Sequence, residues 1–147
     1  MTDTRLYLIT PSEFELDTFA VQLQDALEGG DVASVQLRMK NSYDEDIIKA
    51  AKTLMPICHA KDVAFILNDR PDIAHKVGAD GVHIGPEDMT LKEARAIVGN
   101  AQVIGVTCKD SKHLSMTAGE QGADYVAFGA FYPTTTKIAT SVAEPAI

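Results

Sequence analysis

Three stretches of this 147-residue sequence carry polar side chains of the kinds that bind phosphate or a metal ion. In the first, VQLRMK, alternate positions hold Gln36, Arg38 and Lys40, which project to one side if the backbone stays extended. An arginine and a lysine in this arrangement offer a planar fork and a point charge to phosphate oxygens. A solvent-exposed strand end explains the same spacing, and the spacing alone does not decide between the two interpretations.

The second stretch is acidic and has two parts. Asn68 and Asp69 follow the apolar run FIL, and Asp88 lies further along the chain in GPEDM. Mg2+ takes one or two protein carboxylates together with waters and substrate phosphates, so Asp69 and Asp88 are candidate ligands for it. Spacing alone favours another role for Asp88, which is to stabilise the dipole of a helix that begins just after it. His83 lies nearby, but a lone histidine is more often a packed residue than a ligand.

The third stretch, FGAFYPTTTK, combines a permissive backbone with hydroxyl groups and a cation. Gly129 permits close approach of a ligand, and the anion could be contacted by Thr134, Thr136 and Lys137. The spacing differs from that of a P-loop, so this stretch has little specificity by itself. Thr107, at the end of IGVT, adds one more polar side chain after an apolar run.

Other catalytic patterns are absent from the sequence. We find no Ser-His-Asp arrangement, no zinc spacing and no acid pair of the glycosidase kind. The two cysteines, Cys58 and Cys108, form no CxxC motif and are expected to be reduced thiols.

The charge and hydropathy of the chain limit its partners. A nucleic-acid partner is not expected, because the net charge is −8 and the sequence has no cluster of Lys and Arg to bind a phosphate backbone. Small phosphorylated substrates remain compatible with this charge if a few cations converge with a metal in one cleft. No apolar run approaches the roughly 20 residues that span a bilayer, and the N-terminal segment does not resemble a signal peptide. We therefore expect a cytoplasmic protein with no membrane partner.

The elements that would position these residues alternate between strand and helix. Short apolar runs, typical of a parallel sheet buried on both faces, occur at 6–10, 34–37, 64–67, 81–84, 103–107 and 125–128. Helical patterns lie between them, with shorter ones at 72–77, 90–98 and 111–121. Ser42 or Asp44 is placed to cap the second helix, which Pro56 should kink or shorten. Repeated right-handed βαβ units form either a doubly wound sheet or a barrel, and periodicity does not choose between them.

One internal similarity favours a barrel of repeated units. The segment VGADGVHIG at 77–85 resembles QGADYVAFG at 121–129. In both fold types functional groups gather beyond the C-terminal ends of the strands, and every polar stretch above follows a predicted strand. We therefore predict that one face of the sheet brings together Gln36, Arg38, Asn68, Asp69, Asp88 and Thr107.

Six segments, taken in order, resemble the thiamine phosphate synthase family: LYLIT, VQLRMK, FILNDR, GVHIGPEDM, VIGVTC and DYVAFGAFYPTTTK. The resemblance covers residues 6–137 and implies a TIM (β/α)8-type barrel. It also implies a transferase that joins hydroxymethylpyrimidine diphosphate to thiazole phosphate, giving thiamine phosphate and pyrophosphate. In such a reaction the enzyme must neutralise charge that grows on the departing pyrophosphate, which cations can do.

The resemblance further implies roles for individual residues. Residues that match Asp69 and Asp88 hold Mg2+ in the family. Those that surround the pyrophosphate match Gln36, Arg38, Lys40, Asn68 and Lys137. The residue that matches Thr107 lies near the pyrimidine, and those that match Thr134 and Thr136 lie in the loop that serves the thiazole phosphate. The resemblance therefore implies that the catalytic residues are Arg38, Thr107 and Lys137.

Three features depart from the family pattern. Pro86 stands where Gln usually follows His-x-Gly, and Met39 stands where an acidic residue is usual. A TIM barrel has eight strands and about 250 residues, whereas this sequence shows about six β/α units. We therefore expect an incomplete barrel over 1–137 and an irregular C-terminal tail over 138–147. Its exposed edges should pair with another copy, so we expect a dimer with little or no synthase activity of its own.

The sequence is also compatible with two alternative functions. A thiazole tautomerase-like isomerase would use a similar barrel without the transfer reaction, although the NDR and PTTTK segments favour the synthase. A non-catalytic ligand-binding or assembly protein would be consistent with Pro86 and with the small number of strands.

Overall fold

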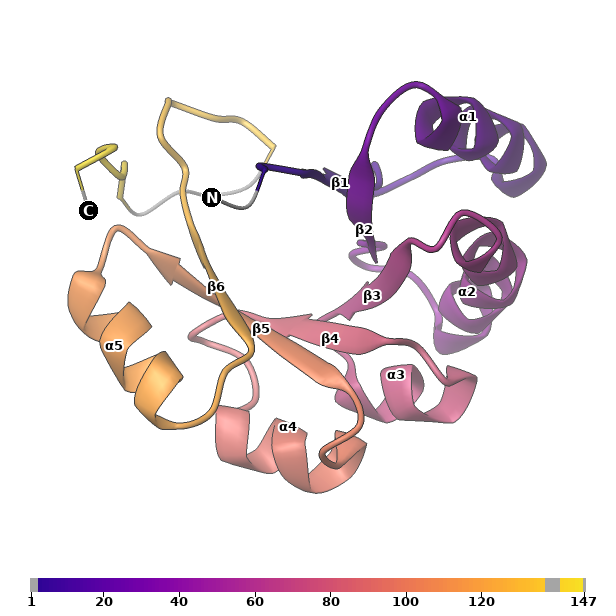
Figure 1. The fold of residues 1–147 in the computed structure, drawn as a ribbon. Coiled ribbons are helices and arrows are strands. Elements are labelled where there is room, and N and C mark those ends of the chain that lie inside the picture. The colour runs from indigo at the N-terminus through magenta and orange to yellow at the C-terminus, as the bar shows by residue number, and fades with distance from the viewer. Residues whose placement is uncertain (1–2, 137–140, 147) are drawn as a thin grey trace.

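A single curved parallel sheet with helices on its outer side makes up the fold (Figure 1). The computed structural model describes residues 3–136 and 141–146. Its elements in chain order are β1 (Leu6–Ile9), α1 (Leu16–Glu28), β2 (Val32–Leu37), α2 (Asp44–His59), β3 (Ala64–Asn68), α3 (Pro71–Val77), β4 (Gly81–Ile84), α4 (Leu91–Val98), β5 (Val103–Lys109), α5 (Lys112–Glu120) and β6 (Tyr125–Phe128). All six strands and five helices of the described chain were predicted, with small shifts at their ends.

The order of the strands decides between the two predicted topologies. Each strand pairs in parallel with the next one along the chain, so the sheet runs from β1 to β6 without a reversal. A doubly wound sheet reverses its strand order at a switch point, so that topology is excluded. The described fold is an incomplete TIM-type barrel, as predicted, with six strands and the five helices between them, and β1 and β6 are the edges of the described sheet.

Alternation along the strands separates the hydrophobic core from the inner side of the curved sheet. Phe65, Val82 and Ile104 point outward, are completely buried and belong to the core shared with the helices. Their neighbours in the same strands project to the inner face, because successive strand residues point to opposite sides. Those neighbours include His83 on β4 and Gly105 on β5. The inner face is therefore the surface on which polar strand residues can meet.

The repeated Gly-Ala-Asp segments have the same structural role in both places. The carboxylate of Asp80 accepts a hydrogen bond from the backbone N–H of Phe65, and the carboxylate of Asp124 accepts one from Ile104. The backbone N–H of each aspartate donates in return to the carbonyl of the same strand residue. The Asp80 clamp joins the start of β4 to β3, and the Asp124 clamp joins the start of β6 to β5. The internal similarity thus reflects repeated β/α units, as predicted.

The predicted caps of helix α2 are wrong, and the kink predicted at Pro56 stays a prediction. Neither Ser42 nor Asp44 caps it, because the N-cap residue is Tyr43, which makes no capping hydrogen bond with its side chain. Asp44 instead begins the helix and accepts hydrogen bonds from Arg70 at 2.6 and 3.0 Å. Pro56 does not end the helix, which continues to His59. The buried side of α2 holds the last turn in place despite the backbone hydrogen bond that Pro56 cannot donate.

Three further features of the described residues concern the cysteines, the helices and the C-terminal tail. Both cysteines are free, as predicted, and both are buried. No helix among residues 3–136 and 141–146 is long and apolar enough to cross a membrane. In the predicted tail, Ala143 is buried and its N–H donates to the carbonyl of Ala130 at 2.7 Å, so this part packs on the loop after β6. Positions 138–140 and 147 of that tail lie outside the described residues.

Candidate functional site

A cavity of about 860 Å³ lies on the inner face of the sheet, at the C-terminal ends of the strands. Its lining comes from all six strands and from the loops that follow β1 and β6. Polar lining residues include Ser12, Gln36, Arg38, Asn68, His83, Thr107, Lys109, Thr134 and Thr136. In a barrel of this type the strand ends bring residues that are distant in sequence into one place, so a single cavity can receive contributions from every β/α unit.

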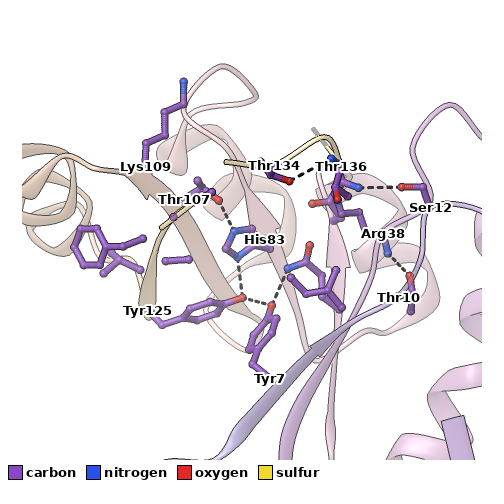
Figure 2. Close-up of a pocket in the computed structure, with 18 of the residues that line it drawn as sticks. Tyr7, Thr10, Ser12, Arg38, His83, Thr107, Lys109, Tyr125, Thr134 and Thr136 are labelled. Carbon is purple, nitrogen blue, oxygen red and sulfur yellow. Dashed lines mark hydrogen bonds between the residues drawn. The ribbon is translucent and has the colours of Figure 1, made fainter. Parts of the chain in front are cut away.

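A chain of hydrogen bonds crosses the floor of this cavity (Figure 2). Gln36 donates through Nε2 to the hydroxyl of Tyr7 at 2.9 Å, and that hydroxyl lies 2.7 Å from the hydroxyl of Tyr125. The Tyr125 hydroxyl lies 3.0 Å from Nδ1 of His83, whose Nε2 lies 2.7 Å from the hydroxyl of Thr107. The chain therefore joins side chains from β2, β1, β6, β4 and β5, in that order.

Burial shapes the acid-base behaviour of the two tyrosines. Gln36 is only 3% exposed, whereas Tyr7 beside it is 37% exposed over the whole residue. Burial raises the pKa of Tyr7, although its hydrogen bonds to Tyr125 and Gln36 oppose the rise. Burial and the hydrogen bond to Tyr7 both raise the pKa of Tyr125. Both phenols are therefore neutral hydrogen-bonding groups at physiological pH, and neither is poised to act as a base.

Arg38 enters the cavity from the end of β2 and is held at two points. Its backbone N–H donates to the hydroxyl of Thr10, and its Nη1 donates to the hydroxyl of Ser12, both at 3.0 Å. Thr10 is itself buried at the end of β1. These contacts fix the direction of the guanidinium before any ligand arrives, which reduces the entropy lost when it binds an anion.

An acidic pair lies beside the cavity. Asp69 follows β3 with a φ of 62°, and its N–H donates to the carbonyl of His83 at 2.8 Å. Asp88 accepts a hydrogen bond from the N–H of Gly85 at 2.8 Å. Burial, followed by a hydrogen bond with the carboxyl of Asp69, raises the pKa of Asp88 above its ordinary value. Two carboxylates this close repel each other, and a bound cation would relieve that repulsion.

Lys40 lies with this acidic pair rather than with Arg38. Its Nζ is 2.9 Å from Oδ2 of Asp69, and it lines a smaller cavity of about 170 Å³ together with that residue. Asn68 lines both cavities and so marks where they meet. The condition for Lys40 to project beside Gln36 and Arg38 is not met, because β2 ends at Leu37 and a turn begins at Lys40.

The loop that carries Asp88 is tied to the end of β5. Lys109, which lines the large cavity, forms an ion pair with Glu87. The alternative interpretation of Asp88 as a helix-capping residue is wrong. Thr90 caps α4 instead, in a capping box with Glu93. The carboxyl of Asp88 is thus not used by the helix and faces Asp69.

Comparison with known proteins decides the family. The family model described as thiamine monophosphate synthase matches residues 6–147. The chain belongs to this family. It is similar to the thiamine-phosphate synthase of Rhodospirillum centenum, with 58% identity over 147 residues, which cover 100% of this chain and 71% of that protein. It is also similar to the thiamine-phosphate synthase of Hyphomonas neptunium, with 47% identity over 146 residues, which cover 96% of this chain and 66% of that protein.

A solved structure supports the same family and fold. The thiamine phosphate pyrophosphorylase from Pyrococcus furiosus aligns with a TM-score of 0.78 and 34% identity over 91% of this chain and 64% of that chain. The chain therefore spans about two thirds of the length of these members of the thiamine monophosphate synthase family.

The chain is a member of the thiamine monophosphate synthase family, and its fold brings most of the predicted site residues to one end of the sheet. The large cavity holds Gln36, Arg38, Asn68, Thr107, Thr134 and Thr136. Asp69, Asp88 and Lys40 form the adjacent acidic group. Lys137 lies outside the described residues. The roles that the family resemblance gives to these residues stay predictions.

Sequence reasoning missed several residues of the cavity. Tyr7 and Tyr125 were not singled out, because a tyrosine in a short apolar strand is ordinary and only its inward position makes it notable. Alternation gave the available signal, since Tyr7 and Gln36 both occupy inward positions of neighbouring strands. No such signal existed for Lys109, whose ion pair with Glu87 depends on how two loops meet.

The acidic pair beside the cavity offers few ligands to a divalent cation, but they are of a suitable kind. Among the described residues there is no group of three or more His, Cys, Asp or Glu placed to hold a metal ion. Asp69 and Asp88 together supply two hard oxygen donors, with Lys40 beside Asp69. Such a pair fits Mg2+, which takes one or two carboxylates and completes its shell with water and phosphate.

Proposed function

We propose that this chain carries out, at the low rate expected of an incomplete barrel, the reaction of its family, in which hydroxymethylpyrimidine diphosphate and thiazole phosphate give thiamine phosphate and pyrophosphate. The observation that supports this most strongly is the common cavity. It unites Arg38, Thr107 and the Thr134 to Thr136 loop, and the acidic pair stands at its border. The names of the similar proteins agree with this activity.

The pyrophosphate is assigned to the part of the cavity between β2 and β4. Arg38 offers a guanidinium already oriented by Ser12, and Asn68 offers an amide at the junction of the two cavities. Lys40 adds a positive charge beside Asp69. These groups stabilise the negative charge that grows on the leaving oxygens as the carbon–oxygen bond breaks.

Asp69 and Asp88 are the residues that would hold Mg2+. When bound, the ion would neutralise negative charge on the pyrophosphate oxygens. Both carboxyl groups would offer oxygen ligands to the ion in their charged form. We therefore propose, from the chemistry of this carboxyl pair, that the reaction requires a divalent cation.

The second substrate needs orientation rather than a strong base. The attacking thiazole nitrogen already carries its lone pair, so no proton has to be removed from it before the new carbon–nitrogen bond forms. Thr134 and Thr136, in the loop after β6, line the cavity, which supports the proposal that their hydroxyls hold the thiazole phosphate. The neutral state of Tyr7 and Tyr125 is consistent with a site that works without a general base.

The proposal is tested by mixing both substrates with Mg2+ and measuring pyrophosphate and thiamine phosphate together. Replacing one preorganised charge-stabilising donor usually costs on the order of a hundredfold in kcat or more, so Arg38→Ala should lower turnover by about that factor. Arg5→Ala is the matched control, because Arg5 pairs with Asp31 on the exposed surface at the opposite ends of the strands. Both products should appear in equal amounts.

A different outcome would favour one of the alternatives. Conversion of a thiazole phosphate tautomer without pyrophosphate release would indicate the isomerase. Binding of pyrophosphate with no turnover under any condition would indicate a non-catalytic ligand-binding protein.

We also propose a cytoplasmic location. Its support is that Cys58 and Cys108 are both free thiols in the structure, as is usual where the environment is reducing.

A further inference from the structure

Two tyrosines from opposite edges of the sheet meet across the inner face, and the proposed reaction gives them no role. Tyr7 lies on β1 and Tyr125 on β6, strands that do not pair with each other. Their hydroxyls are 2.7 Å apart, and their rings are 5.8 Å apart with a tilt of 53°. Figure 2 shows Tyr125 reaching toward both Tyr7 and His83. Something must direct the long side chain of Tyr125 into this position.

Gly105 provides the space that Tyr125 occupies. A Cβ atom at Gly105 would lie 2.0 Å from Cζ, 2.3 Å from the hydroxyl oxygen and 2.4 Å from Cε1 of Tyr125. Distances under 3.0 Å are essentially never found for a real Cβ atom, so any other residue would displace the ring. The φ of Gly105 is not in the left-handed region. The requirement for glycine here is therefore one of space, and a glycine inside a strand often marks such a close approach.

The displaced group would be the centre of the hydrogen-bonded chain. The Tyr125 hydroxyl contacts Tyr7 on one side and Nδ1 of His83 on the other. Its ring also lies against the imidazole, with centroids 5.6 Å apart and a tilt of 35°. His83 in turn contacts the hydroxyl of Thr107, which lines the cavity. A shift of Tyr125 would thus reach Thr107 through His83.

The donors and acceptors of these side chains show what the series of hydrogen bonds controls. The amide nitrogen of Gln36 can only donate, so the Tyr7 hydroxyl must accept from it. In one direction, Tyr7 donates to Tyr125, and Tyr125 donates to Nδ1 of His83. The Nε2–H of His83 then donates to the hydroxyl oxygen of Thr107. In the reverse direction, Nδ1 of His83 donates to Tyr125 and Nε2 accepts the proton of Thr107. The direction of these hydrogen bonds therefore determines whether the Thr107 hydroxyl can donate its proton into the cavity.

We propose that Gly105 is a positioning residue for the site: its missing side chain seats Tyr125, which orients His83 and through it the hydroxyl of Thr107. The inference rests on the proposed function, in which Thr107 contacts the substrate. Gly105 itself touches neither substrate. Its effect passes through the Tyr125 hydroxyl, so the loss of that hydroxyl and the addition of a methyl group at Gly105 act at the same point.

The first measurement needs no activity. In the free protein labelled with 15N, the ring nitrogens of His83 are assigned by comparison with a His83→Gln variant, since the chain has 4 histidines. Gly105→Ala and Tyr125→Phe should both shift the His83 ring signals, because each removes the hydrogen bond to Nδ1. Gly119→Ala is the matched control, because a Cβ there meets nothing within 4 Å, and it should leave the signals unchanged.

The second measurement separates turnover from binding. Misplacing a group by about 1 Å can cost on the order of a hundredfold in rate, so Gly105→Ala should lower kcat by up to that factor. KM for both substrates should change far less, because Arg38 and the acidic pair are untouched. The double variant Gly105→Ala/Tyr125→Phe should be no slower than the slower single variant, since both changes interrupt one link.

The outcomes distinguish this inference from the proposed function. A Gly105→Ala variant with unchanged His83 signals, or with shifted signals and wild-type kcat, overturns the inference. A wild-type chain that releases no pyrophosphate overturns the proposed function whatever the His83 signals show. If Gly105→Ala does not fold, Gly105→Ala/Tyr125→Ala should, because the added methyl group then meets no ring. An unfolded double variant would contradict the steric argument.

Discussion

At the scale of single residues, the junction between the two cavities concentrates the unusual features of the chain. Asn68 lines both cavities, and Asp69 beside it adopts a φ of 62°, which few residues other than glycine adopt. Such a conformation persists only where the surroundings hold it, and here the N–H of Asp69 is held by the carbonyl of His83. The turn directs the carboxyl of Asp69 toward Lys40 and Asp88.

The acidic pair leads to a prediction about ligands. Pyrophosphate should bind more tightly with Mg2+ than with a chelator, by on the order of tenfold, because the ion screens the phosphate from the carboxylates. Asp69→Asn should remove most of that gain, as measured by calorimetry. Asp25→Asn, on the exposed surface of α1, is the control. Equal pyrophosphate affinity with and without Mg2+ in the wild type would exclude a shared metal site.

At the scale of elements, the strands are held in register by side chains as well as by the sheet. Asp124 joins the start of β6 to β5 through the N–H of Ile104, and Arg95 on α4 donates to the same carboxylate at 2.8 Å. Arg95 also donates to the carbonyl of Gln102 at 2.7 Å. A helix and two strands therefore converge on one carboxylate, which fixes how this β/α unit follows the one before it.

The Asp124 clamp makes stability depend on pH. Burial acts to raise the pKa of Asp124, but the hydrogen bonds from Ile104 and Arg95 outweigh it and lower the pKa. A lowered folded-state pKa contributes stability above the ordinary pKa of aspartate, about 4, and that stability is lost as the pH falls below it. Asp124→Asn should lower the free energy of unfolding by about 1 kcal/mol at pH 7, a value reduced by solvent screening.

Urea denaturation from pH 7 to pH 3 checks this. The difference between wild type and Asp124→Asn should shrink as the pH falls below about 4. Asp25→Asn should show no such convergence. A difference that stays constant over the whole range would mean that the charge of Asp124 contributes nothing.

At the scale of the whole molecule, the two edges of the described sheet differ from its centre. The residues of β4 are all buried, whereas Leu6 and Ile9 of β1 are 53% and 56% exposed. An exposed strand edge offers unpaired backbone groups to another chain, and apolar side chains beside it favour that contact. The link between Tyr7 and Tyr125 spans the inner face without covering either edge.

We therefore predict that this chain forms a two-fold dimer through or near β1. Light scattering at micromolar concentration should give at least twice the chain mass of 15.8 kDa. Leu6→Lys should weaken the association, because it places a charge at the edge. Tyr43→Lys is the control, since Tyr43 is 83% exposed and precedes α2, away from both edges. A wild-type monomer at these concentrations would exclude the dimer.

The sequence by itself determined the elements and the end of the sheet at which the polar residues gather. Apolar runs of four or five residues and helical periodicity are local signals, and they located every described strand. The rule that strand ends carry function then brought Arg38, Asn68 and Thr107 to one cavity. The same local signals were wrong where a tertiary contact competes, as when Asp44 binds Arg70 instead of capping α2.

Only the tertiary structure decided which side chains touch. Lys40 pairs with Asp69, because β2 ends at Leu37 and a turn begins at Lys40. Tyr7 and Tyr125 are 118 positions apart, and their contact depends on how far the sheet curves. Curvature accumulates from the twist between neighbouring strands, which short sequence patterns do not encode. The space at Gly105 that admits Tyr125 follows from the same curvature, so its role could be found only from the folded chain.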